Sequence, residues 1–280
     1  MLVSQGDATA RRENMKDGRK VLITGAGGLI GGIVRTSLAS TYTLSGLDMV
    51  AISDFDILVA DIACLPDILP AFEGVDAVVH LAADADNEAP WESMLHNNIV
   101  GTYNVLEAAR ISGVKRVVFA SSNHAMGMYE RDHPYSAIVD GCYEGLVPGA
   151  FPMVDHLMPI RPDGFYGVSK QYGESLARFY HEEHGLTFAC LRIGTVNRDN
   201  NPLGSVRQFA TLCTHRDIAH LIHCCLAAEG LGFEVFYGVS DNKWRFWDIE
   251  HAQQRVGYLP KDNAERWRSE FEAAGGDRKS

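Results

Sequence analysis

Tyr166 and Lys170 are the residues whose types and spacing could do chemistry together. On a helix, positions i and i+4 lie on one face and one turn apart, so the phenol and the ammonium group become neighbours. A phenol loses its proton near pH ~10, and an adjacent ammonium group favours the phenolate and lowers that pKa. The pair therefore predicts a general base. Such pairs are also common on solvated helices, so the interpretation depends on a cofactor site and a partner for the reacting oxygen.

A glycine-rich stretch near the beginning of the chain predicts a dinucleotide site. Residues 20–24 (KVLIT) are predicted to form a short buried strand, and residues 29–38 have helical spacing. Gly25 and Gly28 lie between them, and Gly31 follows in the first turn. Glycines in this context permit a tight turn, a close approach of the backbone to a pyrophosphate, and close helix–strand packing. The helix N-terminus would then supply N–H groups and a positive dipole to the phosphates.

Acidic residues after the next two predicted strands favour NAD over NADP. The strand predicted at 42–47 ends at Asp48, where a carboxylate suits hydrogen bonding to the hydroxyls of the adenosine ribose. It would repel a 2′-phosphate, and no Arg or Lys follows immediately. A third strand, predicted at 57–61, places Asp61 and Ile62 to meet the adenine.

A strand predicted at 114–120 leads into Ser121 and Ser122. In an open parallel sheet, ligands collect outside the carboxyl ends of the strands. A serine hydroxyl at that edge can donate a hydrogen bond to the oxygen of a substrate alkoxide. The strand predicted at 77–83 ends in small residues whose backbone would line a cofactor channel.

The alternation of strands and helices predicts an α/β fold, a doubly wound parallel sheet of the Rossmann type. Residues 1–18 are expected to be a flexible tail, 19–240 the NAD-binding domain, and 241–280 a small C-terminal cap, joined by 194–212 on the substrate side. Residues 125–163 contain five prolines and are expected to form a long loop there, a candidate lid or partner-contact segment. The other predicted elements are helices at 65–72, 97–112, 165–183, 217–228 and 247–257 and strands at 187–193 and 234–239.

Composition excludes several classes of protein. The net charge of −11 argues against a nucleic-acid surface, and no stretch approaches the ~20 apolar residues of a membrane span. The first nineteen residues lack the apolar centre of a secretory signal. Six cysteines without C-x-x-C spacing fit reduced thiols in the cytoplasm. His215, His220 and His223 with Cys224 are expected to be ordinary helix residues, because no carboxylate or second cluster completes a metal site.

Taken in order, these motifs resemble those of the extended short-chain dehydrogenase/reductase family, also called the NAD-dependent epimerase/dehydratase family. The family's G-x-x-G-x-x-G pattern, catalytic serine, tyrosine and lysine fall on Gly25, Gly28, Gly31, Ser122, Tyr166 and Lys170. The resemblance implies NAD as cofactor and a homo-oligomer in which helices 97–112 and 165–183 pack against a symmetry mate. The expected cofactor-binding residues are Gly25, Gly28, Leu29, Ile30, Gly31, Asp48, Asp61, Ile62, Leu81, Ala82, Ala83, Asn98, Ser121, Tyr166, Lys170 and Ile193.

Four further stretches are similar to those of uronate dehydrogenases, and archaeal NAD-dependent glucose-6-phosphate dehydrogenases share much of the pattern. The stretches are 121–124 (SSNH), 161–170 (RPDGFYGVSK), 191–194 (LRIG) and 260–263 (PKDN). This similarity implies oxidation of C1 of glucuronate or galacturonate to the lactone. The implied substrate residues are Ser122, Asn123, His124, Tyr166, Thr195 and Arg207.

Arg207 would bind the anionic group at C6 of that small monosaccharide, because a guanidinium matches carboxylate or phosphate by paired hydrogen bonds. This geometry does not separate a uronate from a sugar phosphate, so glucose-6-phosphate stays an alternative substrate. Nucleotide-sugar epimerases and dehydratases of the family need a sizeable C-terminal region, and only 87 residues follow Ile193 here. A non-catalytic redox sensor or scaffold is disfavoured by the intact Ser122, Tyr166 and Lys170.

Overall fold

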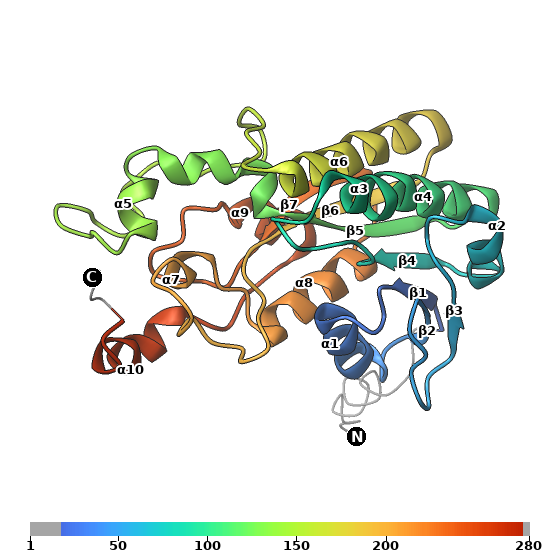
Figure 1. The fold of residues 1–280 in the computed structure, drawn as a ribbon, viewed down its shortest axis with the longest axis horizontal. Helices are drawn as coiled ribbons and strands as arrows, with labels where there is room; N and C mark the ends of the chain where they lie inside the picture. Colours follow the sequence, from blue (N-terminus) through green and yellow to red (C-terminus); the bar gives the residue numbers. More distant parts are fainter. Residues whose placement is uncertain (1–17, 277–280) are drawn as a thin grey trace, which may run out of the picture.

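The strands form one seven-stranded parallel sheet in the order β3-β2-β1-β4-β5-β6-β7 (Figure 1). The computed structural model describes residues 18–276, so nearly all of the predicted tail and the last four residues of the predicted cap lie outside the described residues. The predicted doubly wound α/β fold is confirmed. The strands are β1 (Lys20–Thr24), β2 (Thr43–Asp48), β3 (Ile57–Val59), β4 (Ala77–His80), β5 (Arg116–Ser122), β6 (Thr187–Ile193) and β7 (Phe233–Gly238).

The order of strands reverses direction between β1 and β4. From β1 the chain runs outward through β2 and β3, then returns to pair β4 with the other side of β1. β1 is an apolar strand in which Val21, Leu22 and Ile23 are fully buried, as expected when helices cover both faces. At such a reversal the loops after the two strands diverge and open a crevice for ligands. Gly25 and Leu81, which follow β1 and β4, therefore lie at this edge.

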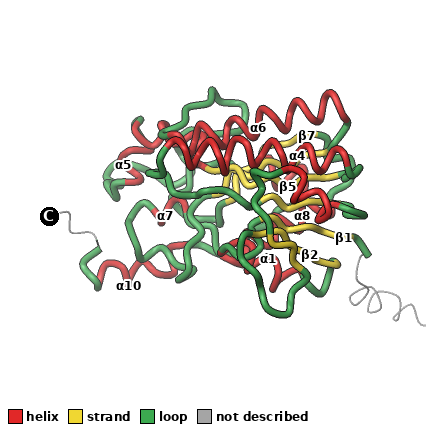
Figure 2. The backbone as a smooth tube through the Cα atoms, turned by 45° about the vertical axis from the view of Figure 1, so that its right-hand side comes forward, coloured by secondary structure: helices red, strands yellow, loops and turns green. Residues whose placement is uncertain are grey.

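Helices cover both faces of the sheet. The α-helices are α1 (Leu29–Leu38), α2 (Leu65–Ile68), α3 (Trp91–Ser93), α4 (Gly101–Ile111), α5 (Tyr135–Val139), α6 (Phe165–His184), α7 (Gln208–Thr211), α8 (His215–Ala227), α9 (Glu250–Val256) and α10 (Arg268–Ala273). Figures 1 and 2 show α4 and α6 side by side on one face, with α1 and α8 on the other. Separate groups of buried side chains fill the two interfaces, with Leu106 and Ala177 in one and Val34 and Leu221 in the other.

Most predicted boundaries lie within three residues of the observed ones. The predicted helix at 65–72 is divided into α2 and a 3-10 helix, η1 (Leu69–Phe72). β5 extends to Ser122, so both serines end the strand instead of following it. The predicted helix at 97–112 begins earlier, as α3 and a π-helix, η2 (Met94–Val100), before α4. A π turn accommodates one extra residue without interrupting the helix, so a search for 3.6-residue periodicity does not reveal it.

Residues 125–163 are less irregular than predicted. The 3-10 helix η3 (Asn123–Arg131) and α5 form its beginning. Tyr135, Ile138 and Val154 are buried in the core on the α8 side, and Val154 forms an isolated parallel bridge with Trp247. Burial of these apolar side chains fixes the segment against the rest of the domain. The segment begins directly after β5, at the carboxyl edge of the sheet.

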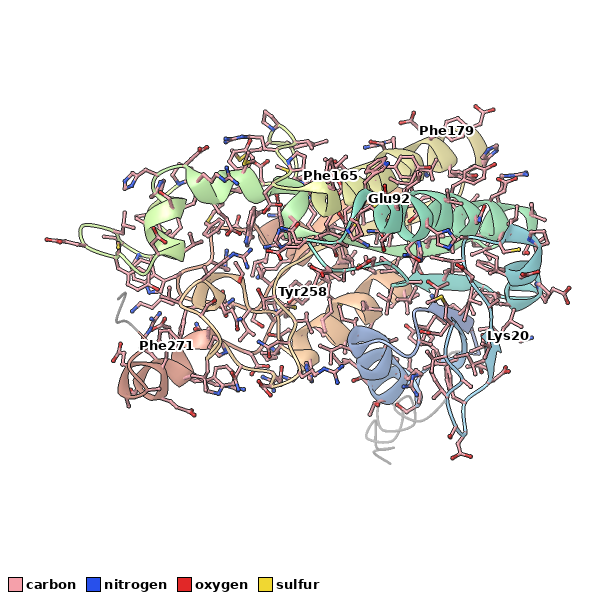
Figure 3. The ribbon with its side chains drawn as sticks, in the orientation of Figure 1. Lys20, Glu92, Phe165, Phe179, Tyr258 and Phe271 are labelled. Carbon is pink, nitrogen blue, oxygen red and sulfur yellow. The ribbon has the colours of Figure 1, made fainter. Side chains whose placement is uncertain are left out.

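A third, smaller group of buried residues joins the C-terminal helices to the segment before α8. Phe209 and Leu212 pack with Ala264 of the 3-10 helix η4 (Ala264–Trp267) and with Phe271 of α10. The rings of Phe209 and Phe271 meet edge to face with centroids 5.0 Å apart. Figure 3 labels Phe271 in this unit, at the end of the molecule away from β1–β3. The division at residue 240 stays a prediction.

Candidate active site

The loop between β1 and α1 has the features of a phosphate-binding turn. Gly25 has φ +70°, and an added Cβ would lie 2.7 Å from the backbone nitrogen of Ala82. A Cβ on Gly31 would lie 2.3 Å from the carbonyl oxygen of Gly25, so only glycine permits this packing. Gly28 is the N-cap of α1, which has no side-chain cap and no acidic residue in its first turn. The first N–H groups of α1, from Leu29 onward, are therefore open to an anion.

Asp48 lies beside this loop at the end of β2. Its carboxylate accepts hydrogen bonds from the backbone nitrogens of Gly27 at 2.8 Å and Val50 at 3.1 Å. These two bonds hold the carboxylate against the glycine turn. A diol bound there would meet a fixed acceptor, which suits a ribose without a 2′-phosphate.

Asp61 and Ile62 follow β3 and are also held by hydrogen bonds. Asp61 accepts from the backbone nitrogen of Ala63 at 2.8 Å and lies 2.9 Å from His96 Nε2. The bond from Ala63 is the main cause that lowers the pKa of Asp61. The carbonyl oxygen of Ile62 accepts from Asn104 Nδ2 at 2.9 Å. The two predicted adenine contacts thus have defined positions.

Ser122 and Tyr166 meet at the carboxyl end of β5. Ser122 is the last residue of the strand and is buried, while Tyr166 is the second residue of α6 and keeps part of its surface exposed. The Ser122 hydroxyl is close enough to the phenol of Tyr166 to lower its pKa. Ile193, which ends β6, is in register with Ser122 and is also buried. A hydroxyl entering here would contact both a serine and a tyrosine hydroxyl.

The pKa of Tyr166 is raised to about 12, opposite to the predicted direction. Burial of the phenol is the main cause and the nearby Asp84 carboxylate adds to it, whereas the hydrogen bond with Ser122 lowers the pKa. Lys170, whose Nζ lies 5.5 Å from the centroid of the tyrosine ring, is not among the groups that shift this pKa. The pair at i and i+4 is present, but burial decides the pKa of the phenol.

Lys170 is itself buried, and burial lowers its pKa to about 8. Its Nζ lies 5.3 Å from the ring centroid of Phe119, a cation–π contact. His80 is also buried here, with its ring nitrogens 2.7 Å from Thr24 Oγ1 and 3.3 Å from Thr102 Oγ1. Burial, with a smaller effect of the Lys170 charge, lowers the pKa of His80 to about 3. At neutral pH the charge of this cluster therefore resides on Lys170.

Asn98 ties the loop after β4 to the first turn of α6. Its Oδ1 accepts from the backbone nitrogen of Asp84 at 2.8 Å, and its Nδ2 donates to the Asp84 carbonyl at 2.9 Å and to Ser169 Oγ at 3.0 Å. Ser169 Oγ donates in turn to the carbonyl oxygen of Tyr166 at 2.7 Å. Asn98 was predicted as a cofactor contact, and its amide is engaged in positioning the residues around Tyr166. The same loop holds Leu81, Ala82 and Ala83, and Ala82 N donates to Thr24 Oγ1 at 3.3 Å.

Ser121, in contrast to Ser122, directs its hydroxyl beneath α6. Its Oγ donates to Glu174 Oε1 at 2.5 Å. Glu174 is paired with Arg192 of β6 through two bonds of 3.0 and 2.8 Å, and both side chains are buried. Only the backbone of Ser121 therefore remains for the predicted cofactor contact.

Asn123 and His124 begin η3, directly after the end of β5. His124 Nδ1 lies 2.8 Å from Asp163 Oδ2, and its ring meets that of Tyr166 edge to face at a centroid distance of 5.9 Å. Asn123 Oδ1 accepts from Ser122 Oγ at 3.4 Å. The buried Asn123 Nδ2 has no hydrogen-bond partner within residues 18–276. A buried N–H group without a partner is costly, so Asn123 is suited to donate to a bound polar ligand.

Thr195 and Arg207 complete this side of the site. Thr195 Oγ1 lies 2.8 Å from Thr211 Oγ1 and 3.5 Å from Arg207 Nη1. Arg207 is already paired, because its Nε and Nη2 donate to the two carboxylate oxygens of Glu130 at 2.5 and 2.7 Å. The structure thus brings the predicted substrate residues to one edge of the sheet.

The sequence analysis missed three neighbours of the site. Glu130, Asp163 and Thr211 approach Arg207, His124 and Thr195 only through the tertiary fold. Asp163 does fall within the stretch 161–170 that carried the resemblance, and its partner could have been sought there. In residues 18–276, no group of three or more His, Cys, Asp or Glu side chains is placed to hold a metal ion.

The parallel sheet, the glycine turn after β1 and the Tyr–Lys helix define the class of dinucleotide-binding α/β proteins. The chain belongs to the NAD dependent epimerase/dehydratase family, whose model matches residues 21–249. The predicted family and the predicted cofactor, NAD, are thereby confirmed.

Characterised relatives are similar over almost the whole chain. The NAD-dependent glucose-6-phosphate dehydrogenase of Haloferax volcanii is 36% identical over 261 residues, covering 90% of this chain and 97% of the relative. The uronate dehydrogenase of Pseudomonas putida is 35% identical over 260 residues, covering 91% and 88%. A solved variant of Agrobacterium tumefaciens uronate dehydrogenase in complex with NAD has a TM-score of 0.78 and 33% identity, covering 91% of this chain and 89% of the other. The resemblance to sugar dehydrogenases is thus confirmed, and both candidate substrate classes occur among these relatives.

Proposed function

We propose that the protein oxidises C1 of a hexuronate, glucuronate or galacturonate, to the lactone with NAD. The observation that carries the proposal is that Ser122, which ends β5, lies near Tyr166 at the start of α6, with Lys170 one turn along the same helix. The glycine turn lies at the same edge of the sheet. Family membership and the sugar dehydrogenase relatives support the same chemistry.

The residues of the glycine turn fit NAD. The uncapped first turn of α1 leaves N–H groups for the pyrophosphate, and Asp48 offers a fixed acceptor for the ribose. The residues that would hold the cofactor are Gly25, Gly28, Leu29, Ile30, Gly31, Asp48, Asp61, Ile62, Leu81, Ala82, Ala83, Asn98, Ser121, Tyr166, Lys170 and Ile193. When bound, NAD supplies the hydride acceptor.

Oxidation removes a hydride from C1 and a proton from its hydroxyl, and a C=O bond forms. Ser122 would hydrogen-bond the reacting oxygen, and Tyr166 Oη would take the proton. The charge on Lys170 favours the phenolate, although burial holds the pKa of Tyr166 at about 12. Because the base must be deprotonated, we expect kcat/KM to rise as pH increases through the neutral range.

The substrate side offers hydrogen-bond donors from η3 and from the residues that follow β6 and precede α7. Asn123 contributes its unpartnered Nδ2, and His124 is held by Asp163 beside the tyrosine ring. Thr195 and Arg207 would meet the far end of the sugar, where a hexuronate carries its carboxylate. This arrangement suits one small sugar ring.

Glucose-6-phosphate is the second candidate substrate. A guanidinium binds phosphate and carboxylate with similar geometry, and the Haloferax volcanii relative is named for glucose-6-phosphate. A nucleotide-sugar epimerase or dehydratase would use the same cofactor but return the hydride. Net NADH formation therefore distinguishes a uronate or glucose-6-phosphate dehydrogenase from an epimerase or dehydratase.

The decisive experiment is a screen for NADH formation with glucuronate, galacturonate, glucose-6-phosphate and glucose, each with NAD and with NADP. We expect NADH with at least one sugar acid or sugar phosphate. In Tyr166→Phe, kcat should fall by about a hundredfold to ten-thousandfold, the range for loss of a general base. Tyr172→Phe removes a phenol hydroxyl from the same helix without touching Ser122 and should keep wild-type kcat.

An unchanged kcat in Tyr166→Phe would contradict the assignment of the base. No NADH with any of the four sugars would contradict the proposed function itself. Comparing the circular dichroism of both variants with the wild type ensures that a loss of activity is not a loss of fold.

We further propose that the protein is a cytoplasmic homo-oligomer with a Rossmann domain at 19–240 and a C-terminal cap. Exposed apolar side chains on α4 and α6, which include Tyr103, Phe165 and Phe179, offer a face for a second copy of the chain, and Figure 3 labels the two phenylalanines on α6. All six cysteines are free thiols, which suits a reducing compartment. No helix within residues 18–276 is long and apolar enough to span a membrane. Analytical ultracentrifugation should give a molar mass at least twice that of one chain.

A further inference from the structure

Arg207 is expected to bind an anion, yet it already forms an ion pair with Glu130. Nε and Nη2 of Arg207 donate to Glu130 Oε2 and Oε1 at 2.5 and 2.7 Å, the side-on arrangement with two parallel bonds. The Glu130 side chain is 13% exposed and that of Arg207 30%. A pair with this partial exposure is screened less than one that lies fully on the surface.

The geometry leaves part of the guanidinium available. Glu130 occupies Nε and one hydrogen of Nη2, while Nη1 faces Thr195 Oγ1 at the long distance of 3.5 Å. A guanidinium has five N–H donors, so Arg207 can still donate to a ligand through its Nη1 edge. It would do so as a hydrogen-bond donor whose charge is already balanced.

The other charges near Arg207 do not restore a cationic site. Asp163 lies near enough to help raise the pKa of Arg207, together with Glu130 and against the effect of burial. Asp163 is itself paired with His124. Two carboxylates and one guanidinium thus line this side of the site. An anionic group that binds to Arg207 would approach Glu130 as well, and the repulsion would offset much of the attraction.

We propose that Glu130 is a specificity-determining residue, which balances the charge of Arg207 so that the C6 end of the sugar is selected mainly by hydrogen bonding. The proposal rests on the proposed sugar dehydrogenase activity and deepens it. With Glu130 in place, the site accepts a neutral hydroxymethyl group at C6 alongside a carboxylate or phosphate. Without its charge, the same site discriminates in favour of anions.

Glucose, glucuronate and glucose-6-phosphate test this directly, because they share one ring and differ only at C6. The measurement is kcat/KM for each sugar with wild type and with Glu130→Gln, which removes the charge and keeps a side chain of the same length. We expect the ratio of glucuronate to glucose to rise about tenfold, through a lower KM for glucuronate, since one unit charge nearby is removed. The ratio of glucose-6-phosphate to glucose should rise at least as much.

Two control variants separate charge from position. Glu144→Gln removes one negative charge from an exposed residue in the same segment and should leave the ratios unchanged. Arg207→Ala combined with Glu130→Gln should abolish the rise in the ratio of kcat/KM for anionic sugars to that for glucose, because the unbalanced cation is then absent. If Glu130 only positions Arg207, Glu130→Gln should lower kcat/KM for all three sugars by the same factor.

The outcomes distinguish this proposal from the proposed function. NADH formation with unchanged or falling anion-to-neutral ratios in Glu130→Gln overturns the role of Glu130 alone. Absence of NADH formation with every sugar in both proteins overturns the proposed function and this proposal with it.

Discussion

Two Arg–Glu pairs with almost the same hydrogen-bond geometry lie in different regions of the molecule. Glu174 and Arg192 join α6 to β6 beneath the helix layer, where their side chains are 6% and 3% exposed. Glu130 and Arg207 join η3 to the segment before α7 at the carboxyl edge of the sheet, with 13% and 30% exposed. The geometry of an ion pair does not show whether its role is structural or functional. The residues around the pair and its exposure to solvent show this.

The buried pair is surrounded by partners that leave no place for a ligand. Glu174 also accepts from Ser121 Oγ and Gln171 Nε2, and Arg192 also donates to Tyr237 Oη. The pair at the edge has fewer partners, since Thr195 Oγ1 is 3.5 Å from Arg207 Nη1, and it is more exposed to solvent. We therefore expect substitutions in the first region to change the free energy of unfolding, and substitutions in the second to change substrate preference.

The largest effect should come from breaking the buried pair. Among residues 18–276, Glu174→Ala leaves the buried charge of Arg192 with Tyr237 as its one hydrogen-bond partner, which should cost about 3–5 kcal/mol of the free energy of unfolding. Denaturant titration measures this cost. Glu182→Ala, on the exposed side of the same helix and paired with Arg178 at 3.7 Å, should cost less than about 0.5 kcal/mol.

A matched double variant tests the reason for that cost. Glu174→Leu with Arg192→Met removes both charges together, and it should be more stable than Glu174→Ala because no uncompensated charge remains. Equal losses in the single and the double variant would show that packing, not the buried charge, dominates. Either way, a loss in Glu174→Ala no larger than in Glu182→Ala would break the contrast between the two regions.

The next effect concerns pH, and it arises from His80, which is buried at the end of β4. The pKa of His80 is lowered from 6.5 to about 3, chiefly by burial. Between these values the unfolded chain binds a proton that the native protein does not, so stability rises with pH and falls as the solution is acidified below pH 6.5. One such group contributes a slope of about 1.4 kcal/mol per pH unit.

His80→Gln tests this, because the amide can still bond Thr24 and Thr102 but does not titrate. Unfolding by denaturant at pH 7, 6 and 5 should show a shallower decline in the variant than in the wild type. Parallel declines would mean that His80 is protonated in the native protein and that its burial does not control the pKa.

The same contrast explains what the sequence could predict. Gly25, Ser122, Tyr166 and Lys170 are recognisable because their roles depend on local features, a turn, a strand end and a helix face. The sheet follows from the alternation of apolar strands with helices. These elements are fixed by spacing along the chain, and the structure places them as expected.

Properties that depend on surroundings could not be predicted in this way. Glu130 and Arg207 are 77 residues apart, and neither belongs to a motif that names the other. The pKa of Tyr166 is raised because burial of the phenol outweighs the effect of Ser122, and burial is a property of the folded protein. Residues 125–163 looked irregular because prolines are frequent there, yet Tyr135 and Ile138 anchor the segment in the core.

Of the two pairs compared, the smaller effect on stability is expected at the edge pair. Glu130→Gln should change the free energy of unfolding by about 1 kcal/mol or less, because Arg207 keeps part of its exposure and can bind water when the carboxylate charge is lost. Denaturant titration of Glu130→Gln beside Glu174→Gln checks this. The two substitutions are chemically identical, so a difference in their costs reports only on the surroundings of each pair.

A cost in Glu130→Gln equal to that in Glu174→Gln would make the edge pair structural, and any change in sugar preference would then follow from a disturbed fold. A small cost combined with an altered anion-to-neutral ratio would assign the two pairs to separate tasks, one to holding α6 on the sheet and the other to choosing the substrate.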